Sequence, residues 1–136
     1  MKKFFLILFI FVATFFITGC SKDKPIIAFS KTPFTKETLY NTTNEFKVGE
    51  RIYFAVYNPK QFKTRLLKLQ VFKKEDEKSE FWGYEYLYNR TLELKNKTTF
   101  SDYVVINNRG FYIFQIFDFT DFKQPVAIGM VRVDPN

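Results

Sequence analysis

The chain after residue 24 consists of short apolar and aromatic runs separated by turn residues, and this alternation sets the fold class. In Arg65–Lys73, apolar and polar residues largely alternate with period 2, which is typical of a strand with one buried face. Arg51–Tyr57 is bounded by turn residues, Val48-Gly49-Glu50 before it and Asn58-Pro59 after it. No stretch of this part shows a sustained 3.6-residue apolar period. We therefore expect an all-β domain.

The remaining runs complete a set of about seven strands, which in just over 100 residues predicts a two-sheet antiparallel sandwich. These runs are 25–29, 81–94, 99–106, 111–117 and 126–133. The charged segment 74–80 is expected to form the tip of a hairpin.

Gly110-Phe111-Tyr112 opens the penultimate run. It resembles the glycine-x-tyrosine start of strand F in immunoglobulin-like domains, in which the tyrosine hydroxyl bonds nearby backbone and fixes the corner. The chain lacks the Cys…Trp…Cys pattern of antibody domains, so the resemblance is to the fold in general. It implies one immunoglobulin-like β-sandwich over residues 25–136.

The first twenty residues have the pattern of a secretory signal. Lys2 and Lys3 precede Phe4–Phe16, a run of 13 residues that is apolar except for Thr14. A membrane-spanning helix needs about 20 apolar residues, so this run is too short to be an anchor. A charged start followed by a short apolar stretch predicts a helical signal peptide over residues 1–19.

Ile17-Thr18-Gly19-Cys20 resembles the lipobox of bacterial lipoproteins, with Ile17 where the family usually has Leu. The resemblance implies cleavage before Cys20, a diacylglycerol on the Cys20 thiol and acyl chains such as palmitate at the new N-terminus. The alternative is an ordinary signal peptide followed by a chance cysteine. Cys20 is the only cysteine in the chain, so no intramolecular disulfide can form.

Cleavage before Cys20 removes 19 of the 136 residues and leaves 117, enough for one domain. Residues 20–24 form a tether, and four extended residues reach at most about 14 Å. We therefore expect the domain to lie close to the bilayer. The predicted location is the non-cytoplasmic side of the cell envelope, with the outer membrane favoured in a Gram-negative cell.

The full chain carries a formal charge of +7, and removing Lys2 and Lys3 leaves 19 basic against 14 acidic side chains. For an exported protein, this excess favours anionic phospholipid or glycolipid head groups over nucleic acid. We favour the simpler interpretation of a lysine-rich solvated surface that maintains solubility.

The sequence contains few residues of the types that usually carry out catalysis. The chain has no histidine, the usual general base and commonest metal ligand, and the Cys20 thiol is expected to be acylated. A carboxylate pair such as Asp118 with Asp121 remains, although aspartates also cap turns. Neither this pair nor Glu75–Glu77 has the spacing of a known calcium loop. We therefore predict no enzyme activity, no cofactor and no metal site.

Four aromatic residues follow one another at period 2 and form a candidate aromatic stripe: Trp82, Tyr84, Tyr86 and Tyr88. In a regular strand they share one face. An exposed stripe would stack against sugar rings or a partner's apolar patch, whereas a buried one would be part of the core.

The second candidate is the last inter-strand loop, with Asp118, Phe119, Asp121 and Phe122. Loops at one end of a sandwich commonly carry recognition. Phe119 and Phe122 either present an exposed apolar surface or fold under the loop to plug the core. We choose this loop as the first candidate binding site.

These features together predict a lipid-anchored, non-enzymatic binding or assembly module whose partner is an envelope protein or a glycan. The alternative is a sandwich resembling protease inhibitors, which would block an enzyme with an exposed loop such as 118–122.

Overall fold

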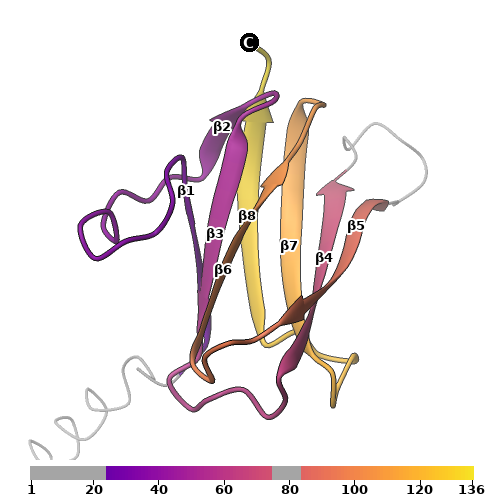
Figure 1. Ribbon diagram of the computed structural model, residues 1–136. Helices are drawn as coiled ribbons and strands as arrows, with labels where there is room; N and C mark the ends of the chain where they lie inside the picture. The colour runs from indigo at the N-terminus through magenta and orange to yellow at the C-terminus, as the bar shows by residue number, and fades with distance from the viewer. Residues whose placement is uncertain (1–23, 75–83) are drawn as a thin grey trace, which may run out of the picture.

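The computed structural model describes residues 24–74 and 84–136 (Figure 1), so the predicted signal peptide, Cys20 and most of the tether lie outside the described residues. The described part is all-β, as predicted. It contains eight strands: β1 (Ile26–Ser30), β2 (Glu45–Lys47), β3 (Arg51–Tyr57), β4 (Leu66–Lys74), β5 (Tyr84–Glu93), β6 (Thr99–Val105), β7 (Gly110–Asp118) and β8 (Ala127–Asp134). Within the described ranges, no helix is long and apolar enough to cross a membrane.

The strands form two sheets packed face to face. One sheet has the order β1-β3-β6, and the other has the order β2-β8-β7-β4-β5 (Figure 1). The pairs are antiparallel except for β2 with β8, which is parallel. This arrangement is an immunoglobulin-like sandwich, and it corrects the expectation of antiparallel strands alone.

The core lies between the sheets because successive strand residues point to opposite faces. In β3, Ile52, Phe54 and Val56 are buried, whereas the residues between them are partly exposed. The Phe114 ring lies at the centre, 4.9 Å from the Phe29 ring and 6.0 Å from the Phe54 ring, centroid to centroid. The core therefore depends on aromatic packing across the sheets.

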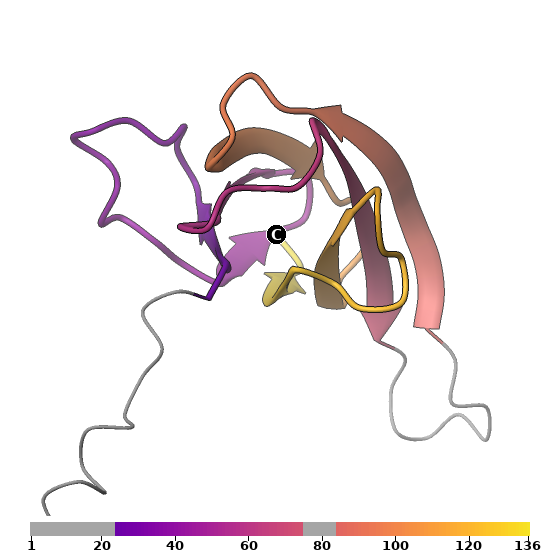
Figure 2. The ribbon, with the colours of Figure 1, turned by 90° about the horizontal axis from the view of Figure 1, so that it is seen from below.

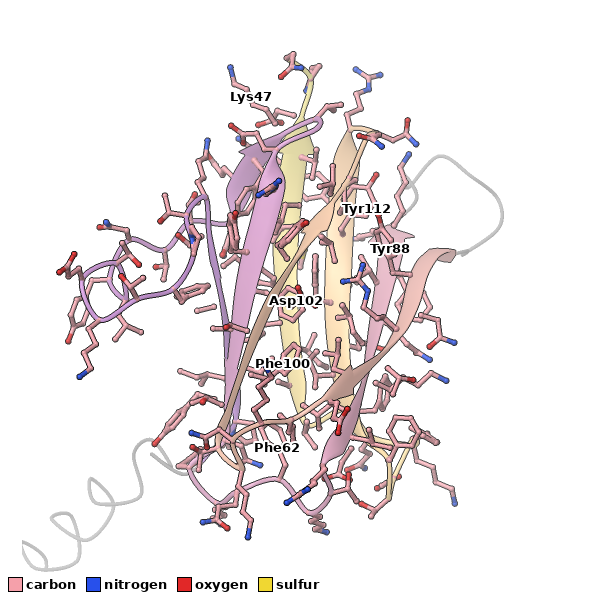
Figure 3. All side chains as sticks on the ribbon, in the orientation of Figure 1. Lys47, Phe62, Tyr88, Phe100, Asp102 and Tyr112 are labelled. Carbon is pink, nitrogen blue, oxygen red and sulfur yellow. The ribbon has the colours of Figure 1, made fainter. Side chains whose placement is uncertain are left out.

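Tyr112 forms the corner that its sequence context predicted. Its ring is buried, and its hydroxyl donates a 2.7 Å hydrogen bond to the carbonyl oxygen of Asn108 (Figure 3 labels Tyr112). The bond fixes the entry into β7, as the tyrosine corner does in immunoglobulin-like domains.

The chain enters the sandwich at the end where β3 leaves it. Ile26, the first residue of β1, pairs with Tyr57, the last residue of β3. Figures 1 and 2 show that β1 begins at the same end of the sandwich as the connections that follow β3 and β7. Any tether before β1 therefore joins the domain at this end.

Candidate binding surface at the loop end

Three connectors lie at the end of the sandwich where the chain enters, and we call them the loop end. They are the segments between β3 and β4 (58–65), between β5 and β6 (94–98) and between β7 and β8 (119–126). Figure 2 views the domain from this end. The loop end contains most of the predicted candidate loop.

Hydrogen bonds join the connectors into one surface. Backbone N–H groups donate from Asn58 to the Thr98 carbonyl at 2.7 Å, from Phe62 to Lys97 at 2.8 Å and from Leu94 to Arg65 at 2.7 Å. The Phe62 side chain is buried under the surface (Figure 3). Connectors tied to one another and anchored in the core present a preformed surface rather than three independent loops.

Asp118, the last residue of β7, ties connector 58–65 to connector 119–126. Its side chain is buried, and its carboxylate accepts hydrogen bonds from the Lys63 N–H at 3.0 Å and the Thr64 hydroxyl at 3.0 Å. It also accepts from the Thr120 N–H at 3.0 Å and the Thr120 hydroxyl at 2.9 Å. Burial raises the pKa of Asp118, but the hydrogen bonds from Thr120, Thr64 and Lys63 outweigh it, so the pKa lies below its usual value.

The aromatic residues of the predicted loop are at the surface. Phe119 is 37% exposed and Phe122 is 50% exposed, with their ring centroids 5.2 Å apart in an edge-to-face arrangement. The Lys68 ammonium nitrogen lies 5.2 Å from the centroid of the Phe122 ring. The Phe122 ring also lies 6.5 Å from the ring of buried Phe117, centroid to centroid. The two rings therefore form a partly exposed apolar pair beside a cation.

The two aspartates of the loop have structural partners. Asp121 is exposed, and its carboxylate accepts a hydrogen bond from the Lys123 N–H at 2.8 Å, which is ordinary turn chemistry. Asp118 already has four donors. Across the described segments, no group of three His, Cys, Asp or Glu residues is placed to hold a metal ion.

The aromatic stripe is described only in part. Trp82 lies outside the described residues, and Tyr84 and Tyr86 are described in their backbone alone. The pairing of β5 with β4 shifts register between Val71, opposite Tyr88, and Phe72, opposite Tyr86. The backbone therefore does not continue the regular alternation on which a single common face depends.

Tyr88 serves to close one edge of the sandwich. It is half-buried, and its hydroxyl donates a 2.7 Å hydrogen bond to the Val105 carbonyl of β6. Beside it, Arg90 forms a 3.3 Å ion pair with Asp102 and lies 5.8 Å from the Tyr88 ring centroid. β5 and β6 are edge strands of different sheets, and these side chains link them.

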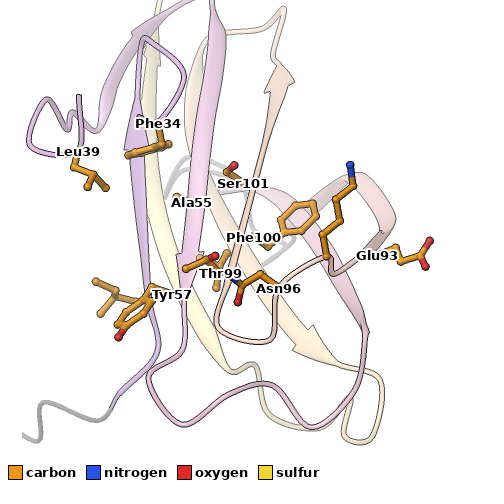
Figure 4. A pocket seen from close by; sticks show the side chains of 12 residues that line it. Phe34, Leu39, Ala55, Tyr57, Glu93, Asn96, Thr99, Phe100 and Ser101 are labelled. Carbon is orange, nitrogen blue, oxygen red and sulfur yellow. The ribbon is translucent and has the colours of Figure 1, made fainter. Parts of the chain in front are cut away.

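A hollow of about 740 Å³ lies next to the loop end, over the outer face of β1, β3 and β6 (Figure 4). Ala55 lies on its floor, in register with Ala28 on one side and Ser101 on the other. The apolar rim consists of partly exposed residues from three segments: Ile26, Phe34, Leu39 and Tyr57.

The three connectors also carry a group of cations that are far apart in the sequence. All six are exposed: Lys60, Lys63, Arg65, Lys95, Lys97 and Lys123. The connectors contain a single acidic residue, Asp121. The sequence shows that segments 58–65 and 94–98 are positively charged, since neither contains an acidic residue. Only the topology places these segments at one end of the sandwich.

Fold and surface together define an immunoglobulin-like β-sandwich with a cationic and aromatic loop end. No protein-family model matches the chain, and no curated protein matches it.

The chain is similar to several solved structures at low sequence identity and with TM-scores below 0.5. A superoxide reductase (neelaredoxin) from Ignicoccus hospitalis is 10% identical with a TM-score of 0.46, over 87% of this chain and 86% of that chain. The CARDB domain of a Pyrococcus furiosus protein, in complex with di-metal ions, is 13% identical with a TM-score of 0.41, over 83% of this chain and 93% of that chain. A β-glucosidase from Listeria innocua is 10% identical with a TM-score of 0.39, over 85% of this chain and 16% of that chain.

Proposed function

We propose that this protein is a lipid-anchored, non-enzymatic binding module of the bacterial cell envelope and that the loop end is its binding surface. The exposed Phe119–Phe122 pair carries the proposal, because it stands on a turn that Asp118 holds in place. A preformed surface loses little conformational freedom on binding, which favours recognition.

The lipobox-like sequence before Cys20 supports the anchoring part of the proposal. One acyl chain gives marginal membrane binding, whereas two or more chains hold a protein stably. The lipid then localises the domain, and the loop end meets an envelope component.

The two aspartates of the candidate loop have structural partners, which supports a binding role for this loop rather than a catalytic one. Asp118 uses its carboxylate within the fold, and Asp121 caps a turn. The held turn is also what an inhibitory loop requires, so a protease inhibitor remains the second candidate. Inhibition of a protease panel that is lost in Phe119→Ala would favour that candidate over docking.

A photo-activatable cross-linking residue at position 122 of the full-length protein, expressed in intact cells, tests the surface. We expect one dominant adduct with an envelope component, and no such adduct from the same residue at Tyr40, which is 92% exposed in the connector after β1. Equal, diffuse labelling from both positions would overturn the assignment of the surface. Metabolic labelling with palmitate, compared with Cys20→Ser, tests the anchor separately.

A further inference from the structure

The net positive charge of the predicted mature chain comes from the loop end. Residues 20–136 contain 19 basic and 14 acidic side chains, of which the three connectors contribute six and one. The rest of residues 20–136 contains thirteen basic and thirteen acidic side chains. The connectors therefore account for the whole charge excess of the predicted mature chain.

The cations of the loop end have no anionic partner within the described part of the protein. The ion pairs of the described residues join Lys31 to Glu50, Arg90 to Asp102, and Arg132 to Glu45 and Asp134. None of them involves a connector residue. Exposed cations without internal partners create a local positive potential that attracts an external anionic surface.

The apolar component lies within the same surface. Phe119 and Phe122 are partly exposed, and the Lys68 ammonium group approaches the Phe122 ring. Exposed Lys123 follows Phe122 in the sequence. Aromatic rings flanked by lysines suit the boundary between head groups and acyl chains, since the rings enter the apolar layer while the ammonium groups meet the phosphates.

The point of chain entry directs this surface towards the bilayer. Lys24, the first described residue, lies two positions before Ile26, whose strand partner Tyr57 immediately precedes connector 58–65. Cys20 is four residues before Lys24, a reach of at most about 14 Å. A lipid on Cys20 therefore keeps the loop end next to the head groups.

We propose that the loop end docks on the anionic phospholipid head groups of the bilayer that holds the anchor. This inference rests on the proposed lipid anchoring and names the partner of the proposed binding surface. The acyl chains and the cationic surface act as two membrane signals, and the second one fixes the orientation of the domain.

The test uses the protein with Phe122→Cys, expressed from the full-length sequence, purified from cell membranes and reconstituted into vesicles. Acylated Cys20 has no free thiol, so a fluorescent probe attaches at position 122 alone. We expect an aqueous quencher to reach the probe several-fold more slowly in vesicles with about 30 mol% phosphatidylglycerol than in pure phosphatidylcholine. About 1 M NaCl, where the Debye length is about 3 Å, should abolish the difference.

A matched pair of variants tests the role of the cations. In the probe-labelled protein, Lys60→Gln/Lys97→Gln/Lys123→Gln should lose the protection, whereas Lys36→Gln/Lys47→Gln/Lys74→Gln, which removes the same charge elsewhere, should keep it. Equal protection in neutral vesicles, or equal effects of the two triple variants, would overturn docking on anionic lipid. An unprotected probe on vesicle-retained protein would also overturn it and would favour a protein partner.

The outcome for the anchor is read separately. If the protein carries no lipid and does not remain on the vesicles, the anchoring proposal fails and the docking inference fails with it. If the protein remains on the vesicles but the quencher reaches the probe freely in both compositions, only the docking inference fails.

Discussion

The Asp118 carboxylate accepts a 3.0 Å hydrogen bond from the backbone N–H of Lys63, 55 residues earlier in the chain. This bond joins the connector after β3 to the connector after β7, and the Thr64 hydroxyl adds a second link at 3.0 Å. The buried carboxylate of Asp118 therefore links the connector after β3 to the connector after β7.

Asp118→Asn should lower the free energy of unfolding by about 1–3 kcal/mol, because hydrogen bonds to a charged acceptor are lost or weakened. Urea denaturation measures the change. Asp121→Asn is the control, since the exposed Asp121 carboxylate accepts one N–H within its own turn. Equal losses in the two variants would show that Asp118 does not hold the connectors together.

The same carboxylate makes stability depend on pH. The pKa of Asp118 is lowered on folding, so its contribution is fully present above its ordinary pKa of about 3.9 and is lost as pH falls through the folded value. Unfolding measured by urea at a series of pH values should show a smaller acid loss in Asp118→Asn than in the wild type. Glu50, whose pKa the Lys47 N–H also lowers, contributes to the loss in both proteins.

Tyr112→Phe removes the hydroxyl that bonds to the Asn108 carbonyl and leaves the buried ring in place. We expect a loss of about 1–2 kcal/mol, the value of one hydrogen bond with its carbonyl left unsatisfied. Thermal or urea unfolding measures it, with Tyr103→Phe as the control because the Tyr103 ring is 39% exposed. A smaller loss in Tyr112→Phe than in Tyr103→Phe would contradict a stabilising corner.

Gly129→Ala should destabilise the domain by about 1–3 kcal/mol through overpacking. A Cβ at Gly129 in β8 would lie 2.6 Å from Ile27 Cγ2 and 2.6 Å from Phe29 Cε2, both in β1 of the facing sheet. These are side chains of the inter-sheet contact, so the sheets must separate or repack.

Gly49→Ala is the comparison for that variant. A Cβ at Gly49 meets nothing within 4 Å, but its φ of +81° is in the left-handed region, which costs about 1–2 kcal/mol for a residue with a side chain. Its Ala variant should therefore lose stability through backbone strain. The two variants differ in a test of packing: Phe29→Leu should restore part of the stability in Gly129→Ala and none in Gly49→Ala.

The strand pattern could be predicted from the sequence because burial alternates with period 2 in β3 and β4. The predicted strand Arg51–Tyr57 coincides with β3. β2 was missed because it has three residues, of which only Phe46 is buried, and because its partner β8 is remote in the chain. Lys74, expected in the hairpin tip, is the last residue of β4.

The candidate loop was predictable because two phenylalanines stand in a polar segment. Its rigidity was not, since the Asp118 carboxylate bonds to residues that only the fold brings near. The cationic surface could not be predicted from the sequence for the same reason. Neighbouring positions in sequence show three separate short connectors, and hydrogen bonds such as Phe62 to Lys97 reveal that they are adjacent.

The concentration of charge at the loop end has a consequence for how the domain meets a surface. Excess charge at one tip gives the molecule a dipole along its strands, and a charged plane exerts a torque on such a dipole before any contact forms. At physiological ionic strength this field decays over about 8 Å, and under the proposed anchoring the residues between Cys20 and Lys24 would reach at most about 14 Å. The proposed anchor would therefore keep the tip within about two Debye lengths of the head groups, where the torque still acts, whereas a tether several times longer would let the domain tumble freely.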